Sequence, residues 1–223
     1  MDFQTFMLGL GETIGMTVIS TFLAYIVGLP LGVLLNITSK TGIKPNRYIN
    51  ISLGILVNIL RSIPCLLLII ILIPLNSSIF GRATGRWFTM IIPLFFASFA
   101  YVARVVEQSL SEVDYGEVEA AKSMGASSFQ IIVKVMLKES VPSLILGGAV
   151  TMVTLLGYTS FAFDFGAGGL ISQAYSVYRS NPVNYLQKPE IWIILVLIVV
   201  VVQVIQEIGL VSAKKIDKRK KLK

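Results

Sequence analysis

Long apolar runs alternate along the chain with short segments that carry most of the charged residues. A helix that crosses the hydrocarbon core of a bilayer, about 30 Å thick, needs about 20 predominantly apolar residues. Five runs reach that length, and they extend over residues 13–37, 50–75, 87–106, 143–165 and 191–211. The pattern therefore predicts five membrane-spanning helices.

The composition supports one all-α membrane domain over residues 1–223. The chain has a mean hydropathy of +0.80, and it is 55% hydrophobic and 14% charged, whereas soluble domains carry about 25% charged residues. One cysteine, Cys65, and no histidine are present, which removes the usual metal ligands and the commonest general base. Most enzyme classes are therefore excluded, and we expect this chain to bind no metal ion or cofactor.

Basic residues lie almost entirely outside the apolar runs. Of the 19 Lys and Arg residues, 14 fall on the side that would hold the carboxyl terminus, four fall on the other side, and Arg61 lies inside the second run. The positive-inside rule therefore places the carboxyl terminus in the cytoplasm and the amino terminus outside. We interpret the basic tail, residues 212–223, as an orientation anchor on anionic lipid rather than a nucleic-acid site. Because no Lys or Arg precedes Lys40, the first run is expected to be a retained span.

The connection between the third and fourth runs, residues 107–142, is the one long cytoplasmic segment, and its pattern predicts two helices separated by a turn. The first helix is expected over residues 112–124, ended by Gly125. Ser127 and Gln130 have capping-box spacing at the start of the second helix, and Pro142 is expected to end it before the fourth span. This second helix should lie along the membrane surface, on an apolar face formed by Phe129, Ile132, Val133 and Met136.

Within this connection, Glu119-Ala120-Ala121 is followed after three residues by Gly125. The arrangement resembles the coupling motif of the permease subunits of bacterial ABC importers. The family pattern continues with an aliphatic residue, one further residue, Leu and Pro, whereas this chain has Lys138 in place of that Pro. The stretches 28–35, 58–64, 157–158 and 166–170 are also similar to permeases of this family, most closely those of methionine importers.

The resemblance implies an integral protein of the bacterial plasma (inner) membrane that is itself no enzyme. It implies half of a homodimeric pathway for an amino acid, most closely methionine, driven by two copies of a cytoplasmic ABC ATPase and supplied by an extracytoplasmic substrate-binding protein. ATP and Mg²⁺ would be held by the ATPase, since this chain has no phosphate-binding loop sequence. The residues implied in coupling to the ATPase are Glu119, Ala120, Ala121, Met124 and Gly125. The alternative interpretation of this segment is an ordinary amphipathic connector.

Arg61 is the one charge well inside a predicted run. A central arginine costs at least ~2.5–3.5 kcal/mol on insertion scales, so it is a functional candidate. Because Pro64 has no N–H to donate, the helix should be broken or kinked there, and Arg61 could satisfy the freed carbonyl groups. The alternative is that Arg61, with Ser62 and Pro64, lines the aqueous pathway or a gate, where an amino-acid carboxylate would pass.

The fourth run has a small, polar face formed by Gly147, Thr151, Thr154 and Tyr158 at helical spacing. Such residues favour either close helix packing or a pathway surface. The outer segment 166–188 is either an interfacial aromatic belt or a platform for the binding protein, and Asp164 is expected to be solvated.

Two alternatives remain for the function as a whole. One is a permease for another small amino acid or metabolite, because no residue identifies a thioether. The other, from a different class, is a passive channel or membrane scaffold, which would not need the helix that ends at Gly125.

Overall fold

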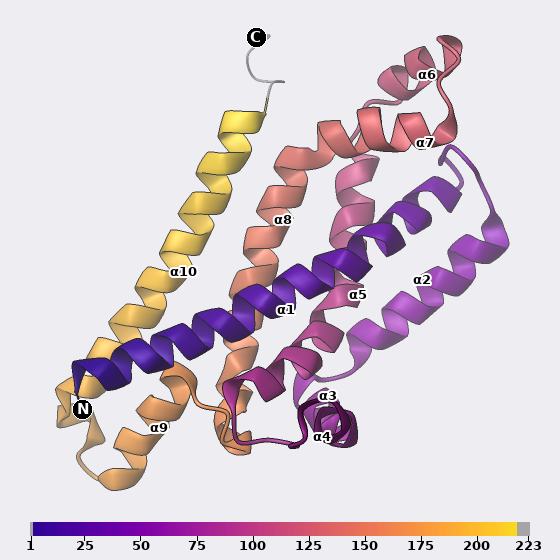
Figure 1. Ribbon diagram of the computed structural model, residues 1–223. Helices are drawn as coiled ribbons and strands as arrows, with labels where there is room; N and C mark the ends of the chain where they lie inside the picture. The colour runs from indigo at the N-terminus through magenta and orange to yellow at the C-terminus, as the bar shows by residue number, and fades with distance from the viewer. Residues whose placement is uncertain (1, 218–223) are drawn as a thin grey trace.

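The computed structural model describes residues 2–217, and within that range the chain is helical and has no strand (Figure 1). The elements are α1 (Phe3–Thr38), α2 (Arg47–Ser62), α3 (Cys65–Ile71), α4 (Ile73–Phe80), η1 (Trp87–Met90), α5 (Ile91–Ser111), α6 (Tyr115–Ser123), α7 (Ser128–Gln130), η2 (Ile131–Met136), α8 (Leu137–Tyr158), η3 (Thr159–Phe165), α9 (Gly169–Ser180), η4 (Tyr185–Gln187) and α10 (Pro189–Ile216). The all-α prediction is confirmed.

Four helical stretches are long and apolar enough to cross a membrane, namely Phe3–Thr38, Trp87–Ser111, Ser128–Phe165 and Pro189–Ile216. The pair α2 and α3 provides a fifth span if it is counted as one, although it is bent by 93°. The first residues of α1 and the last of α10 lie at opposite ends of the bundle (Figure 1), as an odd number of crossings requires. The part of the basic tail at residues 218–223 lies outside the described residues.

The break in the second span lies at the predicted position. α2 ends at Ser62, Ile63 donates its N–H back to the Leu60 carbonyl at 3.4 Å, and Pro64 precedes the first residue of α3. Because proline cannot donate a backbone hydrogen bond, the helical ladder is interrupted here. The prediction of a broken helix at Pro64 is confirmed.

α1 lies along α5 in the most extensive interface of the described chain. A Cβ atom on Gly28 would lie 2.8 Å from the Phe99 carbonyl oxygen, and one on Gly32 would collide with the Ala103 carbonyl oxygen. Glycines four residues apart therefore let the two backbones approach closely, as in other membrane helix pairs. We call this contact the glycine seam.

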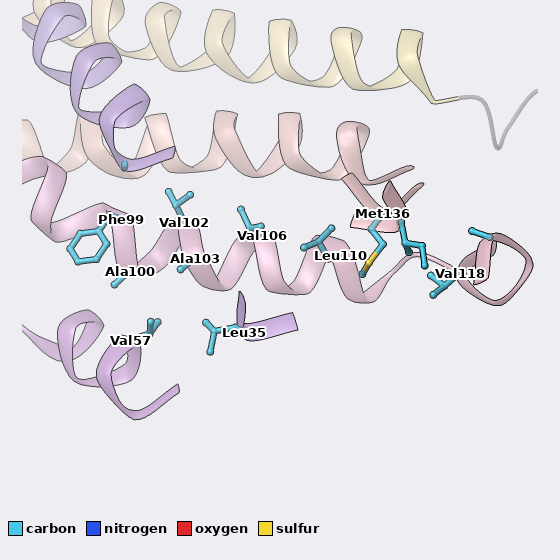
Figure 2. Close-up of a cluster of buried hydrophobic side chains, with 13 residues drawn as sticks. Leu35, Val57, Phe99, Ala100, Val102, Ala103, Val106, Leu110, Val118 and Met136 are labelled. Carbon is cyan, nitrogen blue, oxygen red and sulfur yellow. The ribbon is translucent and has the colours of Figure 1, made fainter. Parts of the chain in front are cut away.

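The main buried cluster surrounds α5 and extends to the end of the bundle that carries α6 (Figure 2). Leu35 of α1 and Val57 of α2 point toward α5, while Val118 and Met136 close the cluster near the α5–α6 connection. The residues that α5 contributes are Phe99, Ala100, Val102, Ala103, Val106 and Leu110.

The connection from α5 to α8 contains the two predicted helices, but two details differ. Both capping-box hydrogen bonds between Ser127 and Gln130 are present. Pro142, however, lies inside α8 and does not end a helix, and the chain changes direction between α7 and α8 (Figure 1). The intervening η2 is a π-helix, and such turns commonly occur where helices bend.

The predicted apolar face of this segment is buried only in part. Ile131 and Met136 are buried, whereas Phe129 is 74% exposed and Val133 is 44% exposed. A π-helix places residues five apart on one face, whereas the prediction assumed a period of 3.6 residues. The π-helix thus turns Ile131 and Met136 together toward the core.

α1 also begins ten residues before the predicted span, at Phe3. Its additional turns pack in a small apolar cluster formed by Phe6, Leu170 and Ile194. Glu12 accepts a 2.7 Å hydrogen bond from the Gly169 N–H, and Thr13 accepts a 3.0 Å bond from the Leu170 N–H. These contacts to α9 stabilise helical turns that are too polar to be recognised as part of an apolar run.

Candidate functional site

A cavity of about 190 Å³ lies between α2, α5 and α8. Three of the predicted pathway residues of α8 are among its lining residues, together with the predicted arginine of α2. The lining residues are Arg61, Ala97, Ser98, Tyr101, Thr151, Thr154, Leu155 and Tyr158. Residues that are more than 90 positions apart in sequence are therefore brought together at one polar site.

Arg61 lies in the last turn of α2 and is exposed. Its guanidinium carbon is 5.7 Å from the centroid of the Tyr101 ring, a cation–π distance. Within residues 2–217 the guanidinium makes no hydrogen bond or ion pair. Arg61 therefore does not satisfy carbonyl groups freed at the break. Its position in the cavity favours the alternative interpretation, in which Arg61 lines the pathway or a gate.

The two other candidates on α2 and α3 lie at the break itself. Ser62 is exposed and donates its hydroxyl proton to the Asn58 carbonyl at 2.8 Å. Pro64 is exposed, and it adopts an extended ψ of 136° before α3. Neither residue lines the cavity. Both lie at the break that ends α2 directly after Arg61.

The small face of α8 is divided between packing and the cavity. A Cβ on Gly147 would collide with the Val105 side chain of α5, so this end of the face is a packing surface. Thr151 and Thr154 instead line the cavity, and each donates its hydroxyl proton within α8, to the Gly147 carbonyl at 2.7 Å and the Val150 carbonyl at 2.9 Å. The packing interpretation therefore holds at Gly147, and the pathway interpretation stays a prediction for Thr151 and Thr154.

Arg104 forms a polar connection that sequence reasoning missed. It makes a 2.6 Å ion pair with Glu107, and its guanidinium also donates to the Gly54 carbonyl at 3.1 Å and to the Asn58 side-chain oxygen at 2.9 Å. Both residues lie toward the end of α5, which continues beyond the predicted run to Ser111. The opposite charges three residues apart, the spacing of a helical ion pair, were the available signal.

The coupling segment presents only part of its motif to solvent. Glu119, Ala120 and Met124 are exposed, and Met124 is 82% exposed. Ala121 instead is 5% exposed and belongs, with Val118, to the main buried cluster. α6 therefore has a buried face fixed to the core and an opposite face that is available for a partner.

Gly125 ends α6 as predicted, and its conformation explains why glycine is needed there. Its φ is +78°, in the left-handed region that favours glycine. The Gly125 N–H donates to the Lys122 carbonyl at 2.9 Å, and the Ala126 N–H donates to the Ala121 carbonyl at 3.1 Å. These two bonds form a Schellman motif, so Gly125 shapes the turn after the exposed surface.

Large apolar side chains are exposed on either side of this turn. Tyr115 is 61% exposed, and Phe129 is 74% exposed. Exposed apolar groups within a polar connection are typical of a surface that a partner covers. We call the exposed residues Glu119, Ala120 and Met124 of the motif the coupling surface.

The opposite end of the molecule carries an aromatic cluster on a polar hollow of about 420 Å³. The Phe163 and Tyr175 ring centroids are 4.2 Å apart, and those of Tyr175 and Tyr178 are 5.8 Å apart. Asp164 is exposed and lines the hollow with Arg179. In the described chain, no group of three or more His, Cys, Asp or Glu side chains is placed to hold a metal ion.

Comparison with known proteins identifies relatives over almost the whole chain. The probable D-methionine transport system permease protein MetI of Haemophilus influenzae is 38% identical over 208 residues, which cover 93% of this chain and 95% of that protein. The protein of the same name from Vibrio cholerae is 37% identical over 210 residues, 93% of this chain and 90% of that protein.

Solved structures agree with this relationship. A chain of the inward-facing MetNI methionine ABC transporter has a TM-score of 0.88 and 34% identity, with 96% of both chains covered, and a second crystal form gives a TM-score of 0.89. A chain of an amino acid ABC transporter with histidines is 19% identical with a TM-score of 0.74, and it shares the fold. Residues 28–219 also match the family described as binding-protein-dependent transport system inner membrane component. The chain therefore belongs to the inner membrane components of binding-protein-dependent transport systems.

Proposed function

We propose that this chain is the permease subunit of an ATP-driven importer for methionine, working as a homodimer with two copies of a cytoplasmic ATPase. The observation that carries the proposal is α6, whose exposed coupling surface lies opposite a face buried in the bundle core. A passive channel or scaffold does not need such a helix. The similarity to MetI permeases over 93% of the chain supports methionine as the transported amino acid.

In this proposal the ATPase binds the coupling surface. A movement of the ATPase displaces α6, and the buried face of α6 transmits this displacement to the helices that it contacts. Val118 and Ala121 pack in the same cluster as Leu110 of α5 and Met136 of η2. Because packed cores transmit displacement rather than absorb it, a shift of α6 would move the cytoplasmic ends of α5 and α8 together.

The pathway would lie along the polar side of α2, α5 and α8. The residues assigned to it or to its gate are Arg61, Ser62, Pro64, Thr151, Thr154 and Tyr158. The break at Ser62–Pro64 separates α2 from α3, so α2 can tilt without carrying α3 as one rigid rod. Alternating access would then use this break as a hinge.

The remaining components belong to partners. ATP and Mg²⁺ would be held by the ATPase, and this chain would perform no chemistry. A substrate-binding protein would dock on the outer aromatic cluster around Tyr175 and Tyr178, and lipid would surround the exposed apolar faces. The amino terminus would face outside and the carboxyl terminus the cytoplasm, as the charge distribution predicts.

The first test is purification of the chain from its native membrane in mild detergent, followed by reconstitution with the proteins that accompany it. We expect an ABC ATPase to copurify, and ATP-driven methionine uptake into proteoliposomes when the binding protein is added. A chain recovered alone under conditions that preserve known importers would contradict the proposal. Uptake of another amino acid, with none of methionine, would contradict the substrate alone.

A matched pair of substitutions tests the coupling surface. Ala120→Arg places a long cation on the exposed face, so uptake should fall by roughly tenfold, equivalent to ~1.4 kcal/mol of docking free energy, while the protein remains folded. Ala121→Arg would bury the same cation in the core and should prevent recovery of folded protein. Ala120→Ser serves as the conservative control. Normal uptake by Ala120→Arg would show that the coupling assignment is wrong.

Cysteine labelling tests the orientation. In a Cys65→Ala background, a reagent that cannot cross membranes should label Asp2→Cys in intact cells and should label Asp217→Cys only after the membrane is opened. The reverse pattern would overturn the orientation while leaving the family assignment intact.

A further inference from the structure

The cavity at Arg61 combines one cationic side chain with several hydroxyl groups and two apolar side chains. Its lining includes no Asp or Glu. Arg61 enters from α2, whereas the hydroxyl groups of Ser98, Thr151 and Thr154 enter from α5 and α8. The polar groups of the cavity are therefore divided between a donor side and a hydroxyl side.

The hydroxyl oxygens of Ser98 and Thr154 are free to accept hydrogen bonds. Ser98 donates its proton to the Leu94 carbonyl at 2.8 Å, and Thr151 and Thr154 donate theirs to carbonyls of α8. A hydroxyl oxygen has two lone pairs and one proton. Because the Ser98 and Thr154 protons are used within the helices, these two oxygens can only accept hydrogen bonds from a molecule in the cavity.

The N–H groups of Arg61 are free to donate hydrogen bonds. The Arg61 guanidinium carbon lies over the Tyr101 ring, 5.7 Å from its centroid, and a cation–π contact leaves the guanidinium N–H groups free to donate hydrogen bonds. Those N–H groups match the two oxygens of a carboxylate. Within residues 2–217 none of them is used in a hydrogen bond.

We propose that this cavity is a transient binding site for the zwitterionic head group of one amino acid. The carboxylate would bind Arg61, the ammonium group would donate to the hydroxyl oxygens of Thr154 and Ser98, and an apolar side chain would contact Ala97 and Leu155. This inference rests on the proposed transport function and specifies how the pathway recognises its substrate. It makes the α-carboxylate the group that the membrane subunit selects.

The size and charge of the cavity are consistent with brief occupancy. At about 190 Å³ it is smaller than the roughly 300–1,000 Å³ of pockets for drug-sized ligands, so it suits one small molecule. An acidic residue facing the ammonium group would hold the zwitterion at both ends, and the cavity offers neutral oxygens instead. A pathway site must bind weakly enough to release its ligand, and this lining meets that condition.

The test compares two probes on the assembled permease–ATPase complex in lipid nanodiscs by saturation-transfer difference NMR, which detects weak binding. The probes are L-methionine and L-methioninol, in which a hydroxymethyl group replaces the carboxylate. We expect L-methionine to bind roughly tenfold more tightly than L-methioninol, because a bidentate charged hydrogen bond is lost. Any binding to the ATPase is common to all permease variants, so differences between variants report the cavity.

Three variants locate the site. Arg61→Gln should remove the preference for L-methionine, and Arg61→Lys should retain part of it, since a single charge remains. Thr154→Val, on the opposite side of the cavity, should weaken the binding of both probes, because both carry the ammonium group. This variant also tests the proposal if Arg61→Gln does not fold. Arg82→Gln, an exposed arginine outside the cavity, is the matched control and should behave as the wild type.

The outcomes separate this inference from the proposed function. If the wild-type transporter shows ATP-driven methionine uptake but Arg61→Gln and Thr154→Val bind both probes as the wild type does, the carboxylate site is wrong and the transport function stands. Equal binding of the two probes by the wild-type complex would also overturn it. If the wild type shows no uptake with its binding protein present, the proposed function fails whatever the NMR result.

Discussion

The two sides of α5 are held by different kinds of contact. On one side the glycine seam brings α1 so close that Gly28 and Gly32 have no space for a Cβ atom. On the other side α2 has a single buried residue, Val57, and is joined to α5 by the side chain of Arg104. Backbone contact therefore fixes one neighbour of α5, whereas a few side-chain contacts fix the other.

This difference indicates which part of the bundle can move. Close-packed backbones have one good arrangement, since any shift creates collisions or voids. The Arg104 bonds to Gly54 and Asn58 of α2 come from a long side chain, and they can be exchanged for others at modest cost. We therefore expect α1 and α5 to move as one body and α2 to change its position relative to them.

The largest effect is expected from filling the glycine seam. Gly32→Leu would force the side chain into the Ala103 carbonyl and the Val106 side chain, so the free energy of unfolding should fall by about 3 kcal/mol or more. Thermal unfolding of the detergent-solubilised complex measures this loss.

Gly11 provides the control for that substitution, because a Cβ atom there would meet no atom within 4 Å. Gly11→Leu in the same helix should change stability little. If Gly32→Leu were as stable as Gly11→Leu, the backbones of α1 and α5 would not be in close contact, and the distinction between the two sides of α5 would be lost.

A smaller effect is expected from removing the side-chain contact between α2 and α5. Arg104→Met keeps the apolar stem but leaves Glu107 and Asn58 without their partner, so stability should fall by about 2 kcal/mol. Because Arg104 is part-buried at 25% side-chain exposure, solvent screens only part of this interaction. The double variant with Glu107→Gln should lose less than the sum of the two single variants.

Function gives a second measure of the same contact. If Arg104 limits the movement of α2, Arg104→Met should raise the rate of ATP hydrolysis in the absence of substrate relative to the wild-type transporter. Arg82→Met, at an exposed position, serves as the control. An unchanged basal rate together with additive stability losses would show that Arg104 does not connect the two helices.

Much of this fold was predictable because lipid imposes simple rules on sequence. Four of the five apolar runs correspond to helices long enough to cross a membrane, and the second corresponds to the bent pair α2 and α3. Pro64 predicted the break in that pair, and Ser127 with Gln130 predicted a helix start. Each of these signals acts over a few neighbouring residues. Gly125 belongs to the same group, because a helix-ending glycine is recognised from its local context.

The features that were missed depend on residues far apart in sequence or on an irregular helix. The additional turns of α1 are stabilised by α9, about 157 residues away, and Arg104 finds two of its partners on α2. The π-helix at residues 131–136 changed which side chains face the core, which a fixed period of 3.6 cannot reveal. The cavity was predicted only as separate residues, because the sequence does not show that α2, α5 and α8 meet at Arg61.

The smallest and most direct comparison uses the same substitution on both sides of α5. Val102 packs against Gly28 in the glycine seam, Val57 is the buried residue of α2, and both are fully buried. Val102→Ala should cost about 1 kcal/mol because a rigid seam cannot close the space, and Val57→Ala should cost less because α2 can move toward α5. Thermal unfolding of the two variants under identical conditions measures the difference. Equal losses would mean that α2 is held as rigidly as α1, and the assignment of α2 as the moving helix would then have to be abandoned.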